Sequence, residues 1–559
     1  MTVSNTQPPS APARRPVLPI VLGFLFLLPA ALACGATQGL LSIGTLVNSL
    51  QRSNPFGGTS VPVGMLNYLY LTQDQNFGTA FGFTALTALV RLLAVALVPA
   101  LLAWGLGQTG RRARWALRLL FTLPVAAFTP VALALMWSLL LRPGGGFLQQ
   151  PVLGQPTSAR LVLLFVDGLY TLGLACAAGL VFALASYRNP DPAKSPRRPL
   201  LAAWGIGLLA AAASSLESFS FSYALTNGGP TGTTTSLVLY LFKVGFMRME
   251  TNLATAVATL ILFLLAVLGL AAGIVIIASG LKISLPGKDE APAPVERSGA
   301  ARGALIAALV VSGLAFLVSL VPLLATVAAA VRPGDAQRLQ AALPPGQTLV
   351  NSLVPALVAA LLLQLPFSYL GALGIGAFRP LGRHSEWLLL PFCLWLFTGP
   401  AVFAAYAFQL ARQMDLLGNL MSLVPPLAVS VPMLVVLTLF FKGQQAGYEK
   451  ARSSGVSGTR AFFNRLVLPS LPLAGLLVLG GLFATMQDTF WQVIFTTQQT
   501  SWTGNVTLLS LGSSLAAGWA VLAKVLLEVS VPGFLFFFLA FGAFQLFYVE
   551  RLSLAGGRD

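Results

Sequence analysis

The sequence has few charged residues: Asp, Glu, Lys and Arg together make up 9% of its 559 residues. Soluble domains carry roughly a quarter charged residues. The hydrophobic fraction is 56% and the mean hydropathy is +0.82. This composition excludes an ordinary soluble protein. It predicts an all-α integral membrane protein, because a helix satisfies its own backbone hydrogen bonds in lipid.

Cysteine and histidine are equally scarce. The three cysteines, Cys34, Cys176 and Cys393, lie in apolar stretches and are interpreted as small core residues. The single histidine, His384, lies in the short segment RPLGRHSEW. These residues form neither a disulfide framework nor a metal-binding set, so no metal site is predicted.

Motifs for nucleotide hydrolysis and for covalent catalysis are missing as well. The sequence contains no G-x-x-x-x-G-K-[ST] loop, so the chain does not hydrolyse ATP by that device. Beyond isolated acids, no cluster of His or Cys and no nucleophile set is visible. We therefore expect a protein that is not an enzyme and that binds no cofactor of its own.

Acidic residues are half as frequent as basic ones, 16 against 33, and the formal net charge is +17. Basic residues at the inner membrane surface meet anionic lipid. The sequence has no soluble segment in which basic and aromatic residues alternate. The lipid bilayer is therefore the expected partner of this charge, and nucleic acid is not.

Long apolar runs recur along the whole chain, and a helix needs roughly 20 such residues to cross a bilayer. A charged segment rich in Pro, Ala and Gly, residues 282–303, divides the series. We predict a first half over 1–281, a cytoplasmic linker over 282–303 and a second half over 304–559, with six spans in each half. The twelve predicted spans lie near 17–38, 80–106, 115–141, 160–185, 200–224, 253–281, 304–331, 350–378, 386–411, 417–441, 470–487 and 515–547.

The distribution of Lys and Arg predicts the orientation. With the N-terminus inside, about 23 of these residues fall in cytoplasmic segments and about 8 in outer ones, as the positive-inside rule requires. Both termini are then cytoplasmic. The two halves also share a motif in their third spans, LPVAAFTP at 123–130 and LPFCLWLFTGP at 390–400. Proline bends a helix, so the motif indicates that the halves are divergent repeats.

One charged segment between two apolar spans, YEKARSSGVSGTRAFFNRLVLP at 448–469, has a distinct pattern. Its helix formers stop at Gly455, and a second short helix is predicted to place Phe462, Phe463 and Leu466 on one face before the chain leaves at Pro469. From the pattern alone, this segment is either a docking knob for a partner or an ordinary amphipathic loop on the membrane.

The segment resembles the EAA loop of bacterial ABC importer permeases, which forms the coupling helix that docks into the ATPase subunit. The departures from the family's pattern are Lys450, Ser454 and one extra residue before the final Leu-Pro. The resemblance implies an ATPase-coupling loop over 442–469. Its candidate residues are Tyr448, Glu449, Ala451, Arg452, Gly455, Phe462, Phe463, Leu468 and Pro469.

Other stretches are similar to the carbohydrate (maltose-type) branch of that family. FSYALTNGGPTGTTTSLVLYLFKVGF at 221–246 looks like the signature of the larger permease subunit, and LGNLMSLVPPLAVSVPMLVVLTLFFKG at 417–443 looks like the smaller one. The chain therefore resembles both permease subunits fused in one polypeptide. The resemblance implies the type I ABC importer fold in a bacterial inner membrane, transporting a sugar. It also implies two ATPase subunits that carry ATP and Mg, and an external solute-binding protein.

The corresponding loop of the first half, SYRNPDPAKSPRRP at 186–199, contains neither Glu nor Gly, and its four prolines oppose a continuous docking helix. Three interpretations remain open: weak coupling through its basic residues, coupling carried mainly by the Glu449 loop, or simple attachment to anionic lipid. The basic residues are Arg188, Lys194, Arg197 and Arg198.

Ionisable residues inside apolar spans are functional candidates, because burying them in lipid is costly. They are Arg91, Asp167, Glu217, Lys524 and Glu528, of which Lys524 and Glu528 stand four apart and are expected to form an ion pair. Hydroxyl groups and aromatic rings near Glu217 suit a sugar, although packing between helices explains them equally. The candidate substrate path comprises Asp167, Glu217, Phe221, Tyr223, Asp488 and Trp491, and the candidate contact for a binding protein comprises Asn227, Gly228, Gly229 and Pro230.

Two alternatives stay open. An ion-coupled secondary transporter with twelve spans has a similar composition. Fused permeases also resemble importers of ferric ion, thiamine or polyamines, and the acids Asp167 and Glu217 would suit a polyamine.

Overall fold

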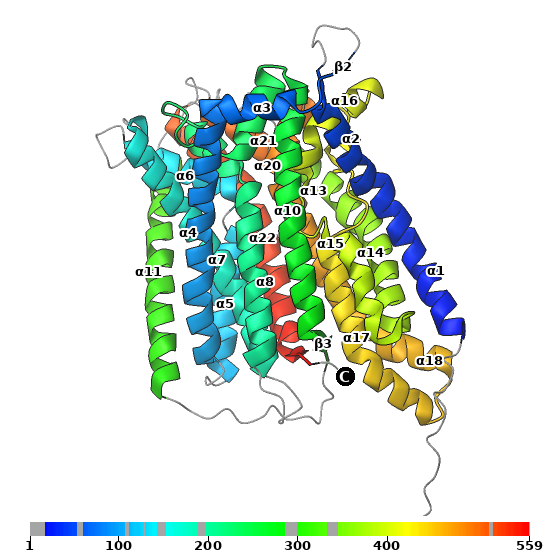
Figure 1. Ribbon diagram of the computed structural model, residues 1–559. Coiled ribbons are helices and arrows are strands. Elements are labelled where there is room, and N and C mark those ends of the chain that lie inside the picture. Colours follow the sequence, from blue (N-terminus) through cyan, green and yellow to red (C-terminus); the bar gives the residue numbers. More distant parts are fainter. Residues whose placement is uncertain are drawn as a thin grey trace, which may run out of the picture.

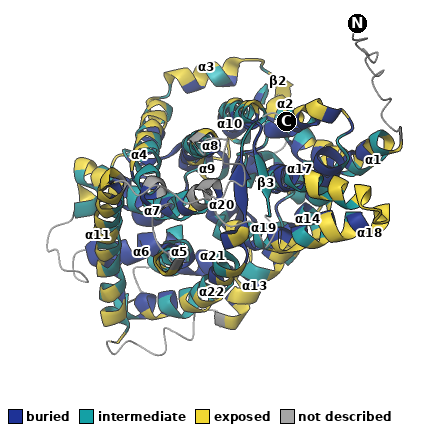
Figure 2. Cartoon of the chain, turned by 90° about the horizontal axis from the view of Figure 1, so that it is seen from below, coloured by how far each residue is buried: buried dark blue, intermediate teal, exposed yellow. Residues whose placement is uncertain are grey.

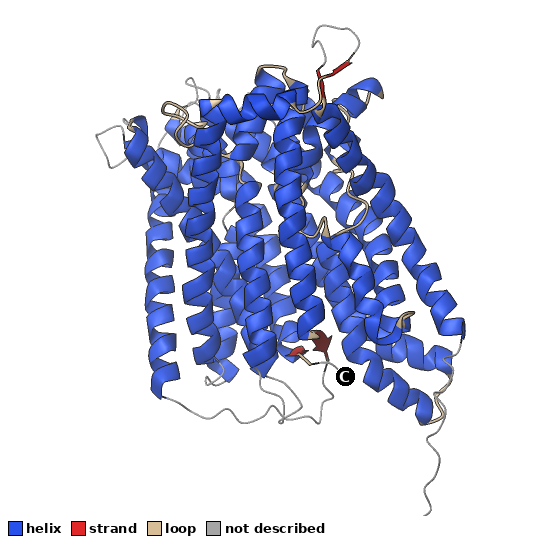
Figure 3. Ribbon diagram, in the orientation of Figure 1, coloured by secondary structure: helices blue, strands red, loops and turns tan. Residues whose placement is uncertain are grey.

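The chain folds into a bundle of long, roughly parallel helices (Figure 1). The structure, a computed structural model, describes residues 17–52, 60–106, 111–127, 129–141, 152–187, 197–285, 299–331, 345–513 and 518–557. Most of these residues, 84%, are helical, and the described strands are limited to two short pairs (Figure 3). The all-α membrane class predicted from composition is confirmed.

The elements follow one another along the chain, with η marking a short 3-10 or π turn of helix. Up to the end of the predicted first half they are α1 (Val17–Cys34), η1 (Gly35–Gly39), α2 (Leu40–Ser49), β1 (Gln51–Arg52), β2 (Val61–Pro62), α3 (Leu66–Gln73), α4 (Gln75–Leu106), α5 (Arg111–Ala127), α6 (Pro130–Leu141), η2 (Val152–Gly154), α7 (Pro156–Tyr187), α8 (Arg197–Leu216), η3 (Ser222–Thr226), α9 (Leu237–Phe242), η4 (Lys243–Met247), α10 (Thr251–Ser279) and β3 (Lys282–Ser284). The rest are α11 (Gly299–Ala330), α13 (Pro345–Leu357), η5 (Val358–Gln364), α14 (Leu365–Ala372), η6 (Leu373–Phe378), η7 (Gly382–Leu389), α15 (Leu390–Cys393), η8 (Pro400–Phe403), α16 (Ala404–Gln413), η9 (Leu420–Leu423), α17 (Val431–Ser453), α18 (Gly458–Phe462), η10 (Phe463–Val467), α19 (Leu468–Gln487), α20 (Thr489–Phe495), η11 (Gln499–Ser501), α21 (Gly504–Ser513), α22 (Trp519–Phe547), η12 (Val549–Arg551) and β4 (Ser553–Ala555).

Within the described residues, nine helical runs are long and apolar enough to cross a membrane, and the bent pair of α5 and α6 makes ten. The sequence predicted twelve. The predicted span over 386–411 is broken into the short pieces η7, α15, η8 and α16. The span over 417–441 is replaced by α17, whose apolar part ends at Lys442 while the helix continues to Ser453.

The two ends of the bundle differ. Helix α3 lies across one end, and α17 and α18 project from the other, which we call the α18 end (Figure 1). Helix α1 begins at the α18 end, and β4 near the C-terminus lies there too. Figure 2 shows exposed outer faces on α1, α11 and α18. Large apolar side chains such as Leu18, Phe263 and Leu314 are more than half exposed, as expected for a lipid-facing surface.

The two predicted halves interlock through their helices. Helix α1 packs on α14 and η6 of the second half, and α11 packs on α4 and α6 of the first. In the same way α5 packs on α22, and α15 packs on α10. Small residues permit the closest crossings: a Cβ at Gly269 on α10 would lie 2.1 Å from the carbonyl oxygen of Cys393 on α15.

A short antiparallel sheet joins the predicted linker to the end of the chain. Lys282 pairs with Ala555 and Ser284 with Ser553, and the hydroxyls of Ser284 and Ser553 lie 2.6 Å apart. Strand β3 packs so closely on α17 that a Cβ at Gly443 would meet the carbonyl oxygen of Ile283 at 2.0 Å. Part of the predicted linker is therefore built into the fold; residues 286–298 lie outside the described chain.

Candidate functional site

The segment that follows the apolar part of α17 forms two helices joined by a glycine turn. Helix α17 runs on to Ser453, and Gly455 then adopts a left-handed conformation with φ of +84°. The N–H groups of Gly455 and Val456 donate to the carbonyls of Arg452 and Ala451 at 3.1 and 3.2 Å, so the turn closes the end of the helix. The local structure agrees with the sequence pattern, while the docking role stays a prediction.

This turn is exposed at the α18 end. Glu449, Lys450 and every residue from 452 to 460 are exposed. The other side of the segment packs on the rest of the chain. Phe462 stacks on Phe378 with ring centroids 5.8 Å apart, and Ala461 and Leu466 are buried. The Arg452 guanidinium lies 6.0 Å from the centre of the Tyr448 ring.

Two details of this segment differ from the sequence prediction. Phe463 does not share the packed face with Phe462 and Leu466 but is 51% exposed, and Leu468 is 61% exposed. Pro469 does not end the second helix, which continues without a break over Gly458–Gln487. The π turn η10 directly precedes α19, and Pro469 lies at this change from π to α winding, where the hydrogen-bond pattern of the helix is already altered.

The corresponding loop of the first half is only partly described. Arg188 and Lys194 lie outside the described residues. Helix α7 ends at Tyr187, and α8 begins at Arg197. Arg198 is exposed.

The segment that follows α8 in the first half meets two segments of the second half, one at Gly399 and one at 488–491. Glu217 follows α8 and accepts a hydrogen bond of 2.7 Å from the backbone N–H of Gly399. The rings of Phe219 and Phe490 lie 4.9 Å apart, and Ser220 donates to the Thr489 hydroxyl at 3.0 Å.

Four of the predicted path residues belong to these two segments. Tyr223 stacks on Phe219 with ring centroids 4.9 Å apart. Asp488 accepts from the backbone N–H of Trp491 at 3.1 Å and so caps α20. The Trp491 indole donates to the carbonyl of Ser422 at 3.1 Å. Glu217, Tyr223, Asp488 and Trp491 therefore cluster, but most of their groups already have partners within the chain.

The other two predicted path residues lie elsewhere. Phe221 is buried and its ring packs edge-on against Tyr170 at 5.4 Å. Asp167 on α7 forms a two-pronged ion pair with Arg91 on α4, with N–O distances of 2.8 and 2.5 Å.

The Arg91 guanidinium is almost fully engaged. Besides Asp167, it donates to the hydroxyls of Ser214 and Ser218 at 3.0 and 3.2 Å. The Asp167 side chain is fully buried, and that of Arg91 is 9% exposed. A buried pair with satisfied donors holds helices together, and a role of Asp167 in the substrate path stays a prediction.

No protein-family model matches the chain. Similar proteins include the sn-glycerol-3-phosphate transport system permease protein UgpA of Yersinia pestis and of its biovar Antiqua strains Antiqua and Nepal516. Each is 27% identical over 277 residues, which cover 44% of this chain and 91% of the relative. The chain is a distant homologue of an ABC importer permease. The predicted resemblance to permeases of this kind is confirmed at the level of a distant homologue, whereas the fusion of two subunits stays a prediction.

Ion pairs that the sequence did not predict also hold this permease together at the α18 end. Lys442 on α17 pairs with Glu386 at 2.7 Å. Arg118 on α5 pairs with Glu550, also buried, at 2.8 Å. The expected pair of Lys524 and Glu528 is not among the ion pairs of the described residues; the Lys524 side chain is exposed instead. Sequence spacing gives no signal for partners that distant helices bring together.

The loop predicted to contact a binding protein forms a tight turn at the end of the permease opposite α18. Asn227 and Gly228 have φ angles of +49° and +79°. The loop is fastened by Lys243, whose Nζ donates to the Asn227 carbonyl at 3.0 Å, and by the Thr234 hydroxyl, which donates to the Gly229 carbonyl at 2.8 Å. Pro230 follows in the same turn.

Asp74, in the outer segment next to α3, stabilises the same end of the permease. It accepts a hydrogen bond of 2.6 Å from the Tyr240 hydroxyl. Burial would raise the pKa of the Asp74 carboxyl, but the hydrogen bonds from Tyr240 and Asn76 outweigh it, so the pKa is below its ordinary value.

A cavity with a volume of about 740 Å³ lies between α4, α7, α8, α10 and α17. Its walls are mainly apolar. Arg91 and Ser214 line it, as do Ile283 of β3 and Leu554 of β4 at the α18 end. Residues from both predicted halves therefore enclose it.

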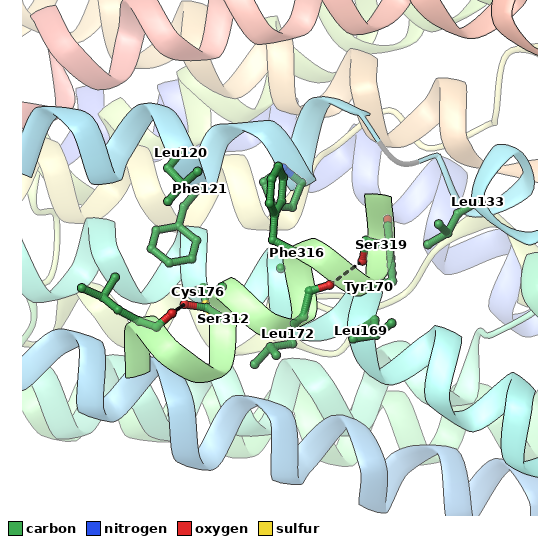
Figure 4. Close-up of a pocket in the computed structure, with 15 residues that line it drawn as sticks. Leu120, Phe121, Leu133, Leu169, Tyr170, Leu172, Cys176, Ser312, Phe316 and Ser319 are labelled. Carbon is green, nitrogen blue, oxygen red and sulfur yellow. Dashed lines mark hydrogen bonds between the residues drawn. The ribbon is translucent and has the colours of Figure 1, made fainter. Parts of the chain in front are cut away.

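A smaller cavity of about 90 Å³ lies between α5, α7 and α11 (Figure 4). The hydroxyls of its two serines turn back to their own helix: Ser312 donates to the carbonyls of Ala308 and Leu309, and Ser319 donates to that of Ala315. The two serine hydroxyls are used in this way, and the rest of the wall is mainly apolar apart from Tyr170.

The contact between Glu217 and Gly399 yields a first prediction. Glu217→Ala should lower the free energy of unfolding by about 1 to 3 kcal/mol, because it leaves the half-buried N–H of Gly399 without an acceptor. Glu217→Gln keeps an acceptor oxygen and should lose less. Thermal unfolding of the purified variants measures both. Equal stability of all three proteins, combined with lost uptake in Glu217→Ala, would instead assign Glu217 to substrate contact.

Proposed function

We propose that this permease forms the membrane pathway of an ATP-driven importer for a carbohydrate. An external solute-binding protein delivers the solute, two ATPase subunits act at the α18 end, and the two halves alternate access to the pathway. The observation that carries the proposal is the exposed turn between α17 and α18, which projects from one end of a permease homologue.

The shape of the turn supports docking of a protein partner. Its exposed tip carries Glu449, Arg452 and Gly455, and Val456 and Phe463 add apolar surface that is 38% and 51% exposed. Charged groups around a small apolar patch are typical of a protein interface. Both described ends of the chain lie on this side (Figure 1), which supports the cytoplasmic orientation proposed from the distribution of basic residues.

Two further observations support the division into halves. The match covers 91% of the relative but only 44% of this chain. The rest of the chain is therefore long enough to form a second unit. The first helix of each half packs on a helix of the other half: α1 packs on α14, and α11 packs on α4. Two repeats that face each other would make such a pair of contacts. We therefore keep 1–281 and 304–559 as the proposed halves, joined across 282–303.

In the first half, movement driven by the ATPase is proposed to be transmitted by contacts within the chain. Strand β3 packs on α17, and its partner β4 packs on α7. Movement of α17 by an ATPase would therefore reach α7, which leads into the loop at 186–199. The basic residues Arg197 and Arg198 then need only a weak contact with the second ATPase.

The carbohydrate is proposed from the sequence resemblance and from the relatives. The relatives' name refers to sn-glycerol-3-phosphate, a phosphorylated polyol, which is chemically close to the sugars that the sequence resemblance implies. A polyamine, thiamine or ferric ion remains the alternative solute.

Affinity purification from the native host tests the proposal. The tagged chain is isolated in mild detergent beside Glu449→Ala and a matched control, Glu250→Ala, which removes an exposed carboxylate at the start of α10. We expect a P-loop ATPase at two copies per chain with wild type and with Glu250→Ala, and loss of the ATPase with Glu449→Ala. Isolation of the chain alone, with uptake abolished by collapsing the ion gradient, would support a secondary transporter instead.

A further inference from the structure

The cavity of about 90 Å³ between α5, α7 and α11 opens on the outside of the bundle as a groove (Figure 4). We call it the α5–α11 groove; its lining includes Leu120 of α5 and Leu309, Gly313 and Phe316 of α11. Leu120 is 41% exposed, and Gly313 is exposed as well. The groove is therefore open to the lipid that surrounds a membrane protein at this depth.

The groove has room for an apolar chain. A Cβ added at Gly313 would meet no atom within 4 Å, so the space in front of this glycine is open. The hydroxyls of Ser312 and Ser319 donate to carbonyls of their own helix, and the rest of the wall is mainly apolar apart from Tyr170. Such a narrow apolar groove suits one acyl chain better than a compact polar solute.

Two exposed arginines, Arg112 and Arg302, lie where α5 and α11 begin. Figure 1 places the start of both helices at the α18 end. On α5, the exposed residues Arg112, Ala116 and Leu120 are spaced by four, so Arg112 lies on the helix face that leads to the groove. On α11, Arg302 precedes Leu309 by seven residues, which also places the two on one face.

The distances along the helices match the depth of one membrane leaflet. Leu120 comes eight residues after Arg112 and Leu309 seven after Arg302, so the groove begins about 10 to 12 Å from the arginines. Phe316 comes fourteen residues after Arg302, or about 21 Å along the helix. One leaflet supplies about 15 Å of hydrocarbon. A phospholipid with its head group at the arginines therefore has its acyl chains at the depth of the groove.

The charge of this region favours an anionic head group. Neither α5 nor α11 contains an acidic residue. The nearby Glu550 is already paired with Arg118 at 2.8 Å and lies 3.9 Å from Arg114. Within the described part of the chain, no ion pair involves Arg112 or Arg302. A phosphate group at this place would meet two guanidinium groups and no competing carboxylate on either helix.

We propose that the α5–α11 groove binds one phospholipid with a net negative head group. Its phosphate accepts hydrogen bonds from the guanidinium groups of Arg112 and Arg302, and one acyl chain occupies the groove beside Gly313. Lipid tails are as apolar as the groove, so the head group provides the selectivity and the groove fixes the position of the lipid. This site is more specific than the general attraction of basic residues to the inner leaflet. It also joins α5 of the first proposed half to α11 of the second.

Native mass spectrometry of the full-length permease in detergent measures the binding of single lipids. Phosphatidylglycerol and phosphatidylcholine with identical acyl chains are the two probes, because they differ in net charge. A basic residue near the membrane surface enriches anionic lipid about fivefold, and two do so about 30-fold. We therefore expect Arg112→Gln/Arg302→Gln to weaken binding of the first phosphatidylglycerol about 30-fold at low salt, and each single variant about fivefold.

Two matched controls separate the head group from the tail. Arg465→Gln removes an exposed arginine near α18, on the other side of the bundle from α11 (Figure 1), and should bind phosphatidylglycerol like wild type. Gly313→Leu fills the groove and should weaken binding of both lipids severalfold. Its control is Gly82→Leu on α4, an exposed glycine whose added Cβ also meets no atom within 4 Å, and it should leave binding unchanged.

The proposal is overturned if wild type binds the two lipids equally, or if Arg465→Gln weakens binding as much as the double variant does. Unchanged binding by Gly313→Leu would also overturn it. If Gly313→Leu does not fold, phosphatidylglycerol with a photoreactive tail decides: labelling of α5 and α11 supports the site, and labelling elsewhere contradicts it. Displacement of the lipid by soluble sn-glycerol 3-phosphate would show a site for free phosphate esters instead. The measurement needs neither ATPase nor solute-binding protein, so its result is independent of import.

Discussion

Gly455→Leu is expected to reduce ATP-driven uptake by a factor of about 5 to 30 without unfolding the permease. The glycine has a φ of +84°, and an added Cβ would meet no atom within 4 Å. The cost is therefore conformational, about 1 to 2 kcal/mol for a left-handed residue, which corresponds to that factor in the population of the turn. The displaced turn would present Glu449 and Arg452 in the wrong direction.

Uptake of labelled solute by reconstituted vesicles, with the ATPase rate measured in parallel, tests this prediction. Gly455→Asn is the matched control, since asparagine tolerates the left-handed region, and it should keep most of the activity. Glu449→Ala should lose uptake as Gly455→Leu does, while its unfolding temperature stays that of wild type. Wild-type uptake by both Glu449→Ala and Gly455→Leu would remove the coupling role from this segment.

The second large effect, a loss of stability, is expected when the buried ion pair of Arg91 and Asp167 is broken. Asp167→Leu leaves the Arg91 guanidinium buried without its counter-charge, and breaking such a pair typically costs about 3 to 5 kcal/mol. The double variant Arg91→Met/Asp167→Leu removes both charges and should regain most of this loss. The expected order of stability is wild type close to the double variant, with Asp167→Leu far below.

Thermal unfolding of the three purified proteins gives the order directly. If Asp167→Leu unfolds at the wild-type temperature but no longer transports, the pair does not stabilise the helices and Asp167 belongs to the substrate path after all. Recovery of stability without recovery of uptake in the double variant would assign the pair both tasks.

What the sequence could predict depended on distance along the chain. Glu449, Gly455 and Phe462 lie within one short segment, so their pattern was readable as helix, turn and helix. The helix continued past Pro469 because a π turn precedes it, a local adjustment that residue types do not reveal. The prediction of one continuous span over 386–411 was wrong, because apolar composition does not show that the helix is interrupted at Gly399.

Contacts between distant segments could not be read in this way. Arg91 and Asp167 were each recognised as costly in lipid, but nothing in the sequence paired them, and Asp167 was assigned to the substrate path. The pairing of Lys282–Ser284 with Ser553–Ala555 joins two polar segments of no special composition. Glu217, Asp488 and Trp491 were predicted as substrate contacts, which stays a prediction, and the sequence did not show that all three use backbone partners.

The packing of α1 against α14 and η6 has a consequence for the order in which the protein assembles during synthesis. Residue 365, where α14 begins, is translated roughly 20 to 70 s after Cys34, the end of α1, at about 5 to 20 residues per second. Helix α1 must therefore wait in the bilayer without its partner. Helix α11 meets α4 and α6 as soon as it is inserted, because both are already made. A nascent chain stalled before residue 365 should accordingly leave Gly23, the close-contact residue of α1, open to lipid and to the insertion machinery.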